Sequence, residues 1–352
     1  MVLGSLALHD FRCFARAEFR PAPGLNLLSA PNASGKSSLL EAVCILLRLQ
    51  SPRAGSLLEA VRRGADGFSL SGRAGDRAVS CHLSKTEGRK LFLDDLPQRK
   101  SDEYLRTGLV AFFSNEDIEL VRGTSSKRRR FLDFLGSQCD AGYLKNLRAY
   151  ERALRSRNFL LKEGSHRGRE ISAYDGPLLA AGQHLGRVRG ELCAELAPLV
   201  AKHVAAISPR GESCGLHYER SGGDNLPAAL AESATEERRL RQTVVGPHRD
   251  DILLELDGAA ASTFASEGQQ RTLTLALRLA QAELIRARRG SPPLYLLDDI
   301  FGELDTERRR RLLAALPPDS QRILTTTTWQ WLEGGDEAAH WTIGDGVVRE
   351  EK

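Results

Sequence analysis

Short apolar runs and helical spacings follow one another along the chain and divide it into three regions. Up to about residue 117 the runs are short and separated by turn-forming residues. This pattern predicts β-strands, with an antiparallel β layer over 64–95. From about 118 to 205 the apolar positions recur at helical spacing and strong β signals vanish. Strand patterns then return at 216–220 and 251–256, together with one long helical pattern over 268–288.

The C-terminal apolar runs 293–297 and 323–327 are short and rich in residues that favour buried strands. Near the N-terminus, a strand over 25–28 is followed by a turn of small residues and then by a helical pattern. Because parallel strands would come from both ends of the chain, we expect one sheet that is split by an insertion. The predicted fold class is α/β, a mixed sheet with helices plus a mainly helical second lobe. The expected divisions are 1–117, 118–205 and 206–352.

Composition excludes several classes of protein. Hydrophobic residues make up 41% and charged residues 27% of the 352 positions, which excludes disorder as the main state. The apolar runs are too short for a bilayer, and the first residues do not form a secretory signal. The six cysteines form no CxxC pair, which argues against a zinc knuckle and fits reduced thiols in a cytosol. We therefore expect a cytoplasmic protein with no membrane partner.

Charge is concentrated in one part of the chain. Residues 122–170 carry 13 Lys and Arg against 5 Asp and Glu, although the net charge of the whole chain is only +4. Such a basic block indicates either a polyanion-binding surface or a solvated helical face. Charge alone leaves both readings open.

The turn after the strand at 25–28 has the composition of a phosphate-binding loop. Small side chains let successive backbone N–H groups surround phosphate oxygens, and the following helix points its positive end at the anion. We expect Lys36 to reach the β- and γ-phosphates of ATP and Ser37 to hold Mg²⁺. Alanine, which tolerates positive φ poorly, replaces the usual glycine at two positions. The predicted nucleotide contacts are Ala30, Pro31, Asn32, Ala33, Ser34, Gly35, Lys36, Ser37 and Ser38.

Two carboxylates directly follow the apolar run 293–297. They lie at the carboxyl end of a predicted strand, and ligands collect at that edge in open α/β sheets. Asp298 is the expected Mg²⁺ partner, through water, and Asp299 is placed to orient the attacking water or to accept its proton. The alternative is that both aspartates only cap the next turn.

A third segment, Ser-Glu-Gly-Gln-Gln at 266–270, begins the long helical pattern. Ser266 and Gln269 can form a capping box. The same residues resemble the signature motif of ABC-type ATPases, in which the serine hydroxyl, the glycine amide and the helix dipole contact the γ-phosphate of a nucleotide on the other subunit. The resemblance implies such contacts for Ser266, Gly268 and Gln269, with Ser266 acting in catalysis, and a D-loop role for Asp305.

The chain also resembles, from end to end, the RecF family of bacterial recombination and repair ATPases. The segments that carry the resemblance are 11–14, 30–37, 115–123, 127–133, 157–161, 246–251, 268–273 and 297–305. Gly-Pro-His-Arg-Asp-Asp at 246–251 and Gly-Gln-Gln-Arg-Thr-Leu at 268–273 are the most specific. The resemblance implies an ABC-type head that binds ATP and Mg²⁺, forms an ATP-dependent homodimer, hydrolyses ATP slowly, and has RecR and RecO as partners. The implied role is recombinase loading at gapped DNA.

Several positions depart from the family pattern. Cys13 stands where asparagine is usual, which bears on the role of Arg12, and Gly302 replaces a common serine. Residues 325–328 are all threonine where transporters carry a switch histidine, so sensing of the γ-phosphate would rest on a hydroxyl. Each change indicates a divergent member or slow hydrolysis.

The basic block supplies the candidate contacts to duplex DNA and to single/double-strand junctions. Three of its arginines share one helix face, and arginine matches phosphate oxygens well. For a single arginine, the alternative is a surface ion pair such as Arg155 with Glu151. The predicted DNA contacts are Lys127, Arg128, Arg129, Arg130, Arg148, Arg152 and Arg155. Two other functions remain open, an ATPase subunit of a transporter and a DNA-binding structural protein with weak or no hydrolysis.

Overall fold

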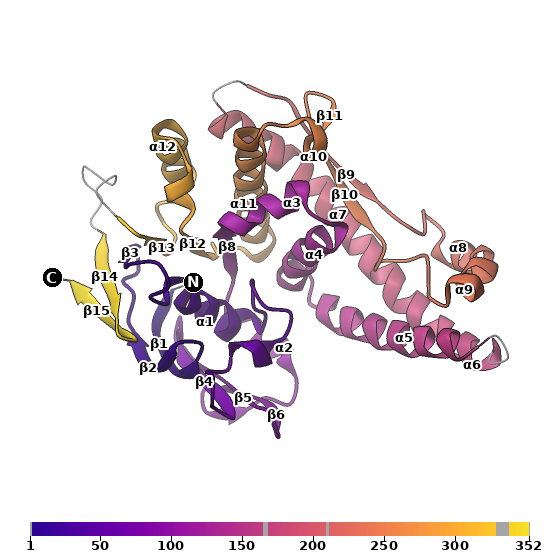
Figure 1. Cartoon of the computed structure of the whole chain (residues 1–352), viewed down its shortest axis with the longest axis horizontal. Coiled ribbons are helices and arrows are strands. Elements are labelled where there is room, and N and C mark those ends of the chain that lie inside the picture. The colour runs from indigo at the N-terminus through magenta and orange to yellow at the C-terminus, as the bar shows by residue number, and fades with distance from the viewer. Residues whose placement is uncertain (1, 165–167, 209–210, 329–337, 352) are drawn as a thin grey trace. The chain divides into compact units, whose positions relative to one another are not determined.

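The computed structural model describes residues 2–164, 168–208, 211–328 and 338–351. The chain forms two compact units (Figure 1). One unit, called the head here, comprises 1–117 and 281–352, and the other, called the arm, comprises 118–280. Within the described residues, no helix has the length and apolar character needed to cross a membrane.

The central sheet of the head draws strands from both ends of the chain, as the split-sheet hypothesis predicted. Its order is β15-β14-β3-β13-β12-β8, and all neighbours are parallel except the β14–β15 hairpin. Sequence patterns had located β3, β12 and β13 but not β8 or the hairpin. The strands are β3 (Leu25–Ser29), β8 (Val110–Ser114), β12 (Leu294–Asp298), β13 (Arg322–Thr326), β14 (Ala339–Gly344) and β15 (Val347–Glu351).

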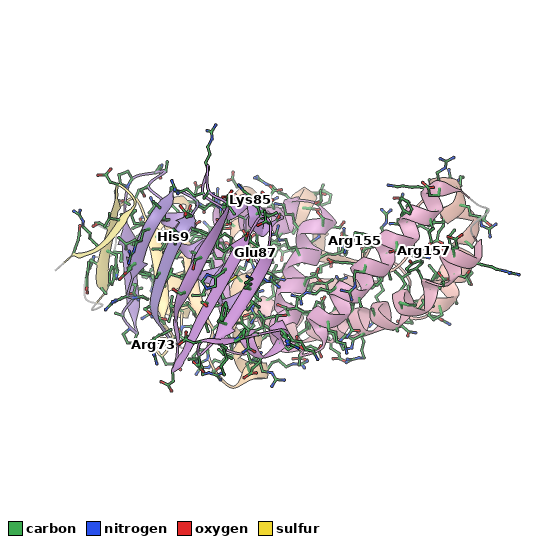
Figure 2. The ribbon with its side chains drawn as sticks, turned by 90° about the horizontal axis from the view of Figure 1, so that it is seen from below. His9, Arg73, Lys85, Glu87, Arg155 and Arg157 are labelled. Atoms are coloured by element: carbon green, nitrogen blue, oxygen red, sulfur yellow. The ribbon has the colours of Figure 1, made fainter. Side chains whose placement is uncertain are left out.

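A second, antiparallel sheet of the head confirms the β layer expected over 64–95. Its order is β2-β1-β4-β5-β6-β7, and Figure 2 shows its strands with His9 and Arg73 labelled. The strands are β1 (Leu3–Phe11), β2 (Phe14–Phe19), β4 (Gly67–Ala74), β5 (Arg77–Ser84), β6 (Gly88–Leu93) and β7 (Leu96–Pro97). Helix α1 (Lys36–Arg48) contacts strands of both sheets, and almost all of its side chains are buried. A helix that is apolar on nearly every side is stable only when covered in this way.

The remaining described elements of the head are short, apart from helix α12, which follows the acidic end of β12. They are η1 (Leu57–Ala60), α2 (Ser101–Tyr104), η2 (Asn115–Ile118, whose last residue opens the arm), η4 (Ile300–Glu303) and α12 (Thr306–Ala315).

The arm is mainly helical, with a small antiparallel sheet of order β11-β10-β9. Its longest helices, α5 (Tyr143–Glu163) and α7 (Asp175–Ile207), pack along each other. The loop expected at 164–168 falls partly outside the described residues. The other elements are α3 (Glu119–Arg122), α4 (Ser125–Cys139), α6 (Gly168–Ser172), β9 (Cys214–Glu219), α8 (Leu226–Glu232), α9 (Ala234–Leu240), β10 (Asp251–Leu256), β11 (Ala259–Ala260) and α10 (Ala261–Phe264).

The second domain boundary differs from the expected one. The first break coincides with the expected division at 117/118, but the chain returns to the head at Gln281 and not at 206. The reason is that β9 pairs with β10 and packs on α7, so these strands belong to the arm. Helix α11 (Glu267–Arg289) therefore begins in the arm and ends in the head. The signature segment lies in the arm.

Candidate nucleotide site

The phosphate loop joins the end of β3 to the start of α1. Ala30 N–H donates to the carbonyl of Thr326 at 3.2 Å, which ties the loop to the neighbouring strand β13. Ala33 has a φ of 65°, so the position does require the left-handed conformation that alanine tolerates poorly. Such a conformation costs an L-residue about 1–2 kcal/mol. The loop is therefore formed despite a local strain at Ala33.

Gly35 is required at the helix entry for two reasons. Its φ of 109° is unfavourable for any side chain, and an added Cβ would lie 2.8 Å from both Cys13 Sγ and Phe14 Cζ. The turn between β1 and β2 thus presses against the phosphate loop. Sequence reasoning had noted Cys13 only as a departure from the family pattern.

Arg12, in the same turn, is held by an internal ion pair. Its guanidinium donates to both carboxylate oxygens of Glu41 at 2.8 and 2.7 Å, and also to the carbonyl of Glu59 at 2.7 Å. Glu41 is fully buried on α1 and accepts a further bond from Ser51 Oγ at 2.5 Å. The hydrogen bonds to Glu41 raise the pKa of Arg12 above its usual value. Arg12 therefore pins the β1–β2 turn to α1.

Lys36 lies folded into the loop. Its Nζ donates to the carbonyls of Ala30 and Pro31 at 2.5 and 3.0 Å. Burial lowers the pKa of Lys36, and the nearby Asp299 and Asp298 oppose this shift. In the same loop Ser34 Oγ is buried and has no hydrogen-bond partner among the described residues. A buried polar atom without a partner is costly, and a phosphate oxygen would satisfy it.

Asp298 ends β12 in a nearly closed environment, with 8% of its surface exposed. Its Oδ1 accepts from Ser37 Oγ and from Thr325 Oγ1, both at 2.9 Å. Burial raises the pKa of this carboxyl, although the two hydroxyl donors counteract it. The contact brings together the two residues that the sequence assigned to Mg²⁺, and both offer the hard oxygen ligands that Mg²⁺ prefers.

Asp299 adopts a left-handed conformation, with φ of 54°. Its N–H donates to Thr325 Oγ1 at 2.9 Å, and its carbonyl accepts from Asn115 Nδ2 at 3.1 Å. Burial raises the pKa of the Asp299 carboxyl, and Lys36 counteracts the rise. Both carboxylates also oppose the effect of burial on the pKa of Lys36, and their roles in holding Mg²⁺ and in orienting the attacking water remain predictions.

Thr325 is the residue whose role sequence reasoning missed. It is fully buried on β13, and one hydroxyl serves both aspartates by donating to Asp298 and accepting from Asp299. We had expected a threonine of the run 325–328 to sense the γ-phosphate. In this structure the Thr325 hydroxyl bonds the Asp298 carboxylate and the backbone N–H of Asp299, and the parallel register of β12 and β13 brings these groups together. Sensing of the γ-phosphate by a hydroxyl of this run remains a prediction.

These residues fit Mg-ATP. The loop offers Lys36 and the buried Ser34 hydroxyl, which has no hydrogen-bond partner among the described residues. The Ser37–Asp298 pair offers oxygen ligands at the end of the loop. A cluster of three or more His, Cys, Asp or Glu is absent from the part of the chain that the structure describes. A cation held by Ser37 and Asp298 would take further ligands from the phosphates, as Mg²⁺ in nucleotide sites does.

The signature segment begins α11 with the expected capping box. Ser266 N–H donates to Gln269 Oε1 at 2.8 Å, and Gln269 N–H donates back to Ser266 Oγ at 3.4 Å. Gln269 Nε2 also donates to Glu212 Oε1 at 3.2 Å. In the head, Asp305 caps α12 by accepting the N–H of Arg308 at 2.8 Å. The nucleotide contacts of Ser266, Gly268, Gln269 and Asp305 remain predictions.

The predicted DNA contacts separate into two groups. Arg128 binds both carboxylate oxygens of Asp251 at 2.6 and 2.8 Å, and Arg129 donates to the carbonyl of Asp250 at 2.8 Å, so both tie α4 to the start of β10. The side chains of the second group are exposed or half-buried. This group consists of Lys127, Arg130, Arg148, Arg152 and Arg155. DNA binding by all seven remains a prediction, and it is better founded for the second group.

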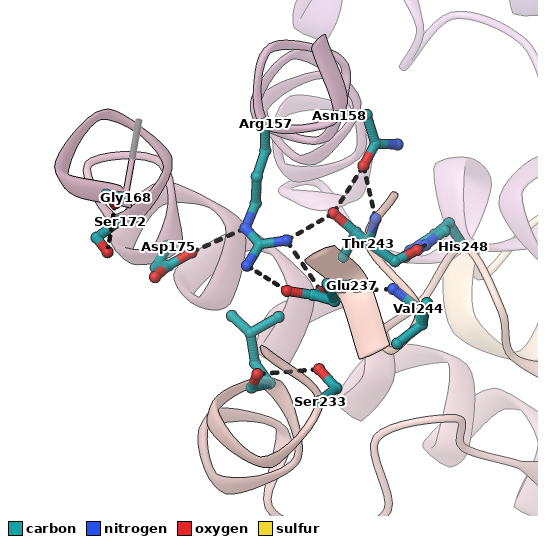
Figure 3. Close-up of polar contacts among 11 residues, drawn as sticks. Arg157, Asn158, Gly168, Ser172, Asp175, Ser233, Glu237, Thr243, Val244 and His248 are labelled. Carbon is teal, nitrogen blue, oxygen red and sulfur yellow. Dashed lines mark hydrogen bonds and ion pairs between the residues drawn. The ribbon is translucent and has the colours of Figure 1, made fainter. Parts of the chain in front are cut away.

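A buried polar network in the arm was not predicted. Arg157 binds Asp175 at 2.9 Å and Glu237 at 2.7 Å, and also donates to Thr243 Oγ1 at 2.8 Å (Figure 3). A second centre, Arg189, binds Asp133 at 2.7 Å and the carbonyl of Pro247 at 2.6 Å. Residues of the segments 157–161 and 246–251 therefore serve the arm's own packing. Their resemblance to a family was visible in the sequence, but their partners were not.

The fold and the site together define an ABC-type ATPase head with a helical arm. The family model for the RecF/RecN/SMC N-terminal domain matches residues 2–348. The DNA replication and repair protein RecF of Anaeromyxobacter sp. (strain Fw109-5) is 38% identical over 99% of both chains, and that of Symbiobacterium thermophilum is 35% identical over 88% of this chain and 87% of its own. The chain belongs to the RecF family.

Solved structures agree with this assignment. The recombination mediator protein RecF of the RecFOR pathway, solved with ATP, has a TM-score of 0.89 and 28% identity over 99% of this chain and 97% of its own. An Smc head bound to a winged-helix domain of ScpA has a TM-score of 0.57 at 15% identity, covering 100% of this chain and 97% of its own, and shares the fold. The RecF/SMC type of ABC ATPase is thus the class of this chain.

Proposed function

We propose that this protein is an ATP-dependent DNA-binding protein of recombinational repair. ATP binding joins two copies head to tail, and the joined pair clamps duplex DNA, including single/double-strand junctions. Slow, DNA-stimulated hydrolysis releases the clamp. Its activity promotes recombinase loading at gaps, with RecR and RecO as partners. The partners are proposed from the RecFOR pathway named for a structure 28% identical to this chain.

The observation that carries the proposal is the Lys36–Ser37–Asp298 arrangement at the end of β12. Lys36 would move from the loop carbonyls to the β- and γ-phosphates, and Ser37 with Asp298 would hold Mg²⁺. The bound cation supplies charge neutralisation on the phosphates. Asp299 would orient the attacking water or accept its proton, a role that its position directly after Asp298 supports.

Joining two copies is proposed because the segment 266–270 resembles the signature motif of ABC-type ATPases, which meets the nucleotide held by the other subunit. Ser266 begins α11 in the arm, while Lys36 lies in the head. In the proposed dimer the nucleotide on Lys36 of one copy meets Ser266, Gly268 and Gln269 of the other. The N-terminus of a helix and a free backbone N–H are suited to a γ-phosphate.

The first test measures ATP binding and self-association of the purified chain. We expect the wild type to bind Mg-ATP and to sediment as a dimer only when ATP is present, and Lys36→Arg to remain a monomer. An ATP-bound wild type that stays monomeric at every concentration would contradict the dimer. Turnover measured with and without duplex DNA separates a slow ATPase from a DNA-binding protein that does not hydrolyse ATP.

A further inference from the structure

The outer face of α5 carries a stripe of five side chains. Arg148, Arg152, Arg155, Phe159 and Lys162 lie at positions i, i+4, i+7, i+11 and i+14 of the helix. With 3.6 residues per turn these positions share one face, and the stripe is about 21 Å long. We call these residues the α5 stripe. Phe159 is 60% exposed, between the exposed Arg155 and Lys162.

The helix is fixed so that Phe159 cannot turn inward. Its neighbours in sequence, Arg157 and Asn158, bind other elements of the arm: Arg157 is 4% exposed and pairs with Glu237, and Asn158 Oδ1 accepts the N–H of Thr243 at 2.8 Å (Figure 3). Leu160 and Leu161 pack into an apolar cluster with Ile171. Rotating α5 to cover Phe159 would break these bonds and expose this cluster. The exposure of Phe159 is therefore built into the arm.

The chemistry of the α5 stripe selects its ligand. Four cations lie on the same face of α5 as one large apolar ring, and the helix itself carries two acidic residues, Glu151 and Glu163. A protein partner that needs apolar contact would find a single ring here. An anionic chain that also carries flat apolar faces matches both features, and a single-stranded nucleic acid is such a chain. In a continuous duplex the base faces are already stacked, so a ring gains contact only where bases are unpaired.

We propose that Phe159 stacks on an unpaired base of DNA, at a gap or a single/double-strand junction, while Arg152, Arg155 and Lys162 contact the flanking phosphates. The inference rests on the DNA binding proposed above and adds the feature of the DNA that the arm reads. Phe159 distinguishes a junction from a blunt duplex, and the arginines do not.

The test measures binding of the full-length protein, with Mg-ATP, to three labelled DNAs by fluorescence anisotropy. The DNAs are a duplex with a single-stranded overhang, a blunt duplex of equal length and the single strand. We expect Phe159→Ala to weaken binding to the first and third by about 5- to 150-fold, the range found for loss of one stacked base. Binding to the blunt duplex stays within about twofold, and Phe159→Trp retains the wild-type preference.

Two control variants separate stacking from other effects. Leu240→Ala removes another exposed apolar side chain of the arm and should leave all three affinities unchanged. Arg152→Gln should weaken binding to the three DNAs alike and reduce the salt dependence, since it removes a phosphate contact. As a direct readout, 2-aminopurine at the first unpaired position should be quenched by the wild type and by Phe159→Trp but not by Phe159→Ala.

Three results would overturn the inference. If Phe159→Ala binds all three DNAs as tightly as the wild type, Phe159 does not contact DNA, and the proposed function stays intact. An equal loss on all three DNAs, with unchanged thermal unfolding, would make Phe159 part of a general contact and not a reader of unpaired bases. If the wild type binds none of the DNAs, the proposed function fails together with the inference.

Discussion

Gly35 stands where the strand β3, the helix α1 and the β1–β2 turn come together, and no other residue type fits there. Its positive φ and the short distances from an added Cβ to Cys13 and Phe14 act on the same position. Gly75 has a positive φ as well, but open space around its Cβ position. The pair therefore separates backbone strain from crowding.

Gly35→Ala should lower the free energy of unfolding by about 2–5 kcal/mol, the sum of strain and overpacking, and abolish binding of an ATP analogue. Gly75→Ala should cost only the strain, about 1–2 kcal/mol, and leave nucleotide binding intact. Urea unfolding and calorimetric titration measure the two effects. Equal stability losses in both variants would show that Cys13 and Phe14 can move away and that crowding is not important.

Thr325 holds the acidic end of β12 through one hydroxyl. Thr325→Val keeps the shape, but leaves the Asp299 N–H without its acceptor and Asp298 with one donor fewer. We expect a loss of about 1–3 kcal/mol in stability and a fall of about 10- to 100-fold in ATP turnover or Mg²⁺ affinity. Thr325→Ser should restore both.

The matched control for this variant is Thr326→Val. The Thr326 hydroxyl donates to the carbonyl of Thr328 and does not touch the aspartates. Its loss should leave the Mg²⁺ dependence of turnover unchanged. A Thr325→Val protein with wild-type turnover at every Mg²⁺ concentration would mean that Asp298 and Asp299 hold their positions without the hydroxyl.

At the scale of elements, His248 connects α5 to the loop before β10. Its Nε2–H donates to the carbonyl of Thr243 at 3.0 Å, so its Nδ1 accepts from the Tyr150 hydroxyl at 2.6 Å. Burial lowers the pKa of His248 to about 4. The bond to Thr243 and the charge of Asp250 oppose the shift, while Arg249 and Arg129 add to it. His248 is thus a neutral side chain in the folded arm at pH 7.

The unfolded chain binds a proton at His248 near pH 6.5, but the folded chain only near pH 4. The stability from this residue is therefore fully present above pH 6.5 and is lost as the pH falls toward 4, by at most about 3 kcal/mol. His248→Gln should remove this part of the pH dependence. Urea unfolding of both proteins from pH 4 to 8 gives the difference, and parallel curves would show that His248 titrates normally in the folded state.

Elements with a strong local pattern could be predicted from the sequence, and their partners could not. The helix at 36–48 and the strands at 25–29 and 294–298 follow from apolar runs bounded by turn residues. β9 and β10 were also found, but they were assigned to the wrong unit because only their mutual pairing ties them to the arm. The sequence also did not reveal the ion pair of Arg128 with Asp251, because the two residues are 123 positions apart. Arg128 was therefore predicted as a DNA contact with no internal partner in view.

At the scale of the whole molecule, the proposed dimer makes one nucleotide site from two copies. A copy with Lys36→Ala keeps its signature segment, and a copy with Ser266→Arg keeps its phosphate loop. Neither variant alone should dimerise with ATP or hydrolyse it, although Ser266→Arg should still bind ATP, because the Lys36–Ser37–Asp298 arrangement lies wholly within the head. Each variant lacks a different half of the site.

Mixing the two variants should restore part of the activity. In the mixed dimer one site combines the intact loop of one copy with the intact signature segment of the other, while the second site lacks both halves. We expect sedimentation with ATP to show dimers in the mixture only. If the two sites act independently, the turnover per mixed dimer should reach at most about half of the turnover of one wild-type dimer. If the mixture remains as inactive as its parts, either hydrolysis needs both sites intact, although one intact site joins the copies, or Ser266 does not face the nucleotide of the other copy. A mixed dimer that forms with ATP yet hydrolyses none would identify the first case, and a mixture without dimers would contradict the head-to-tail arrangement.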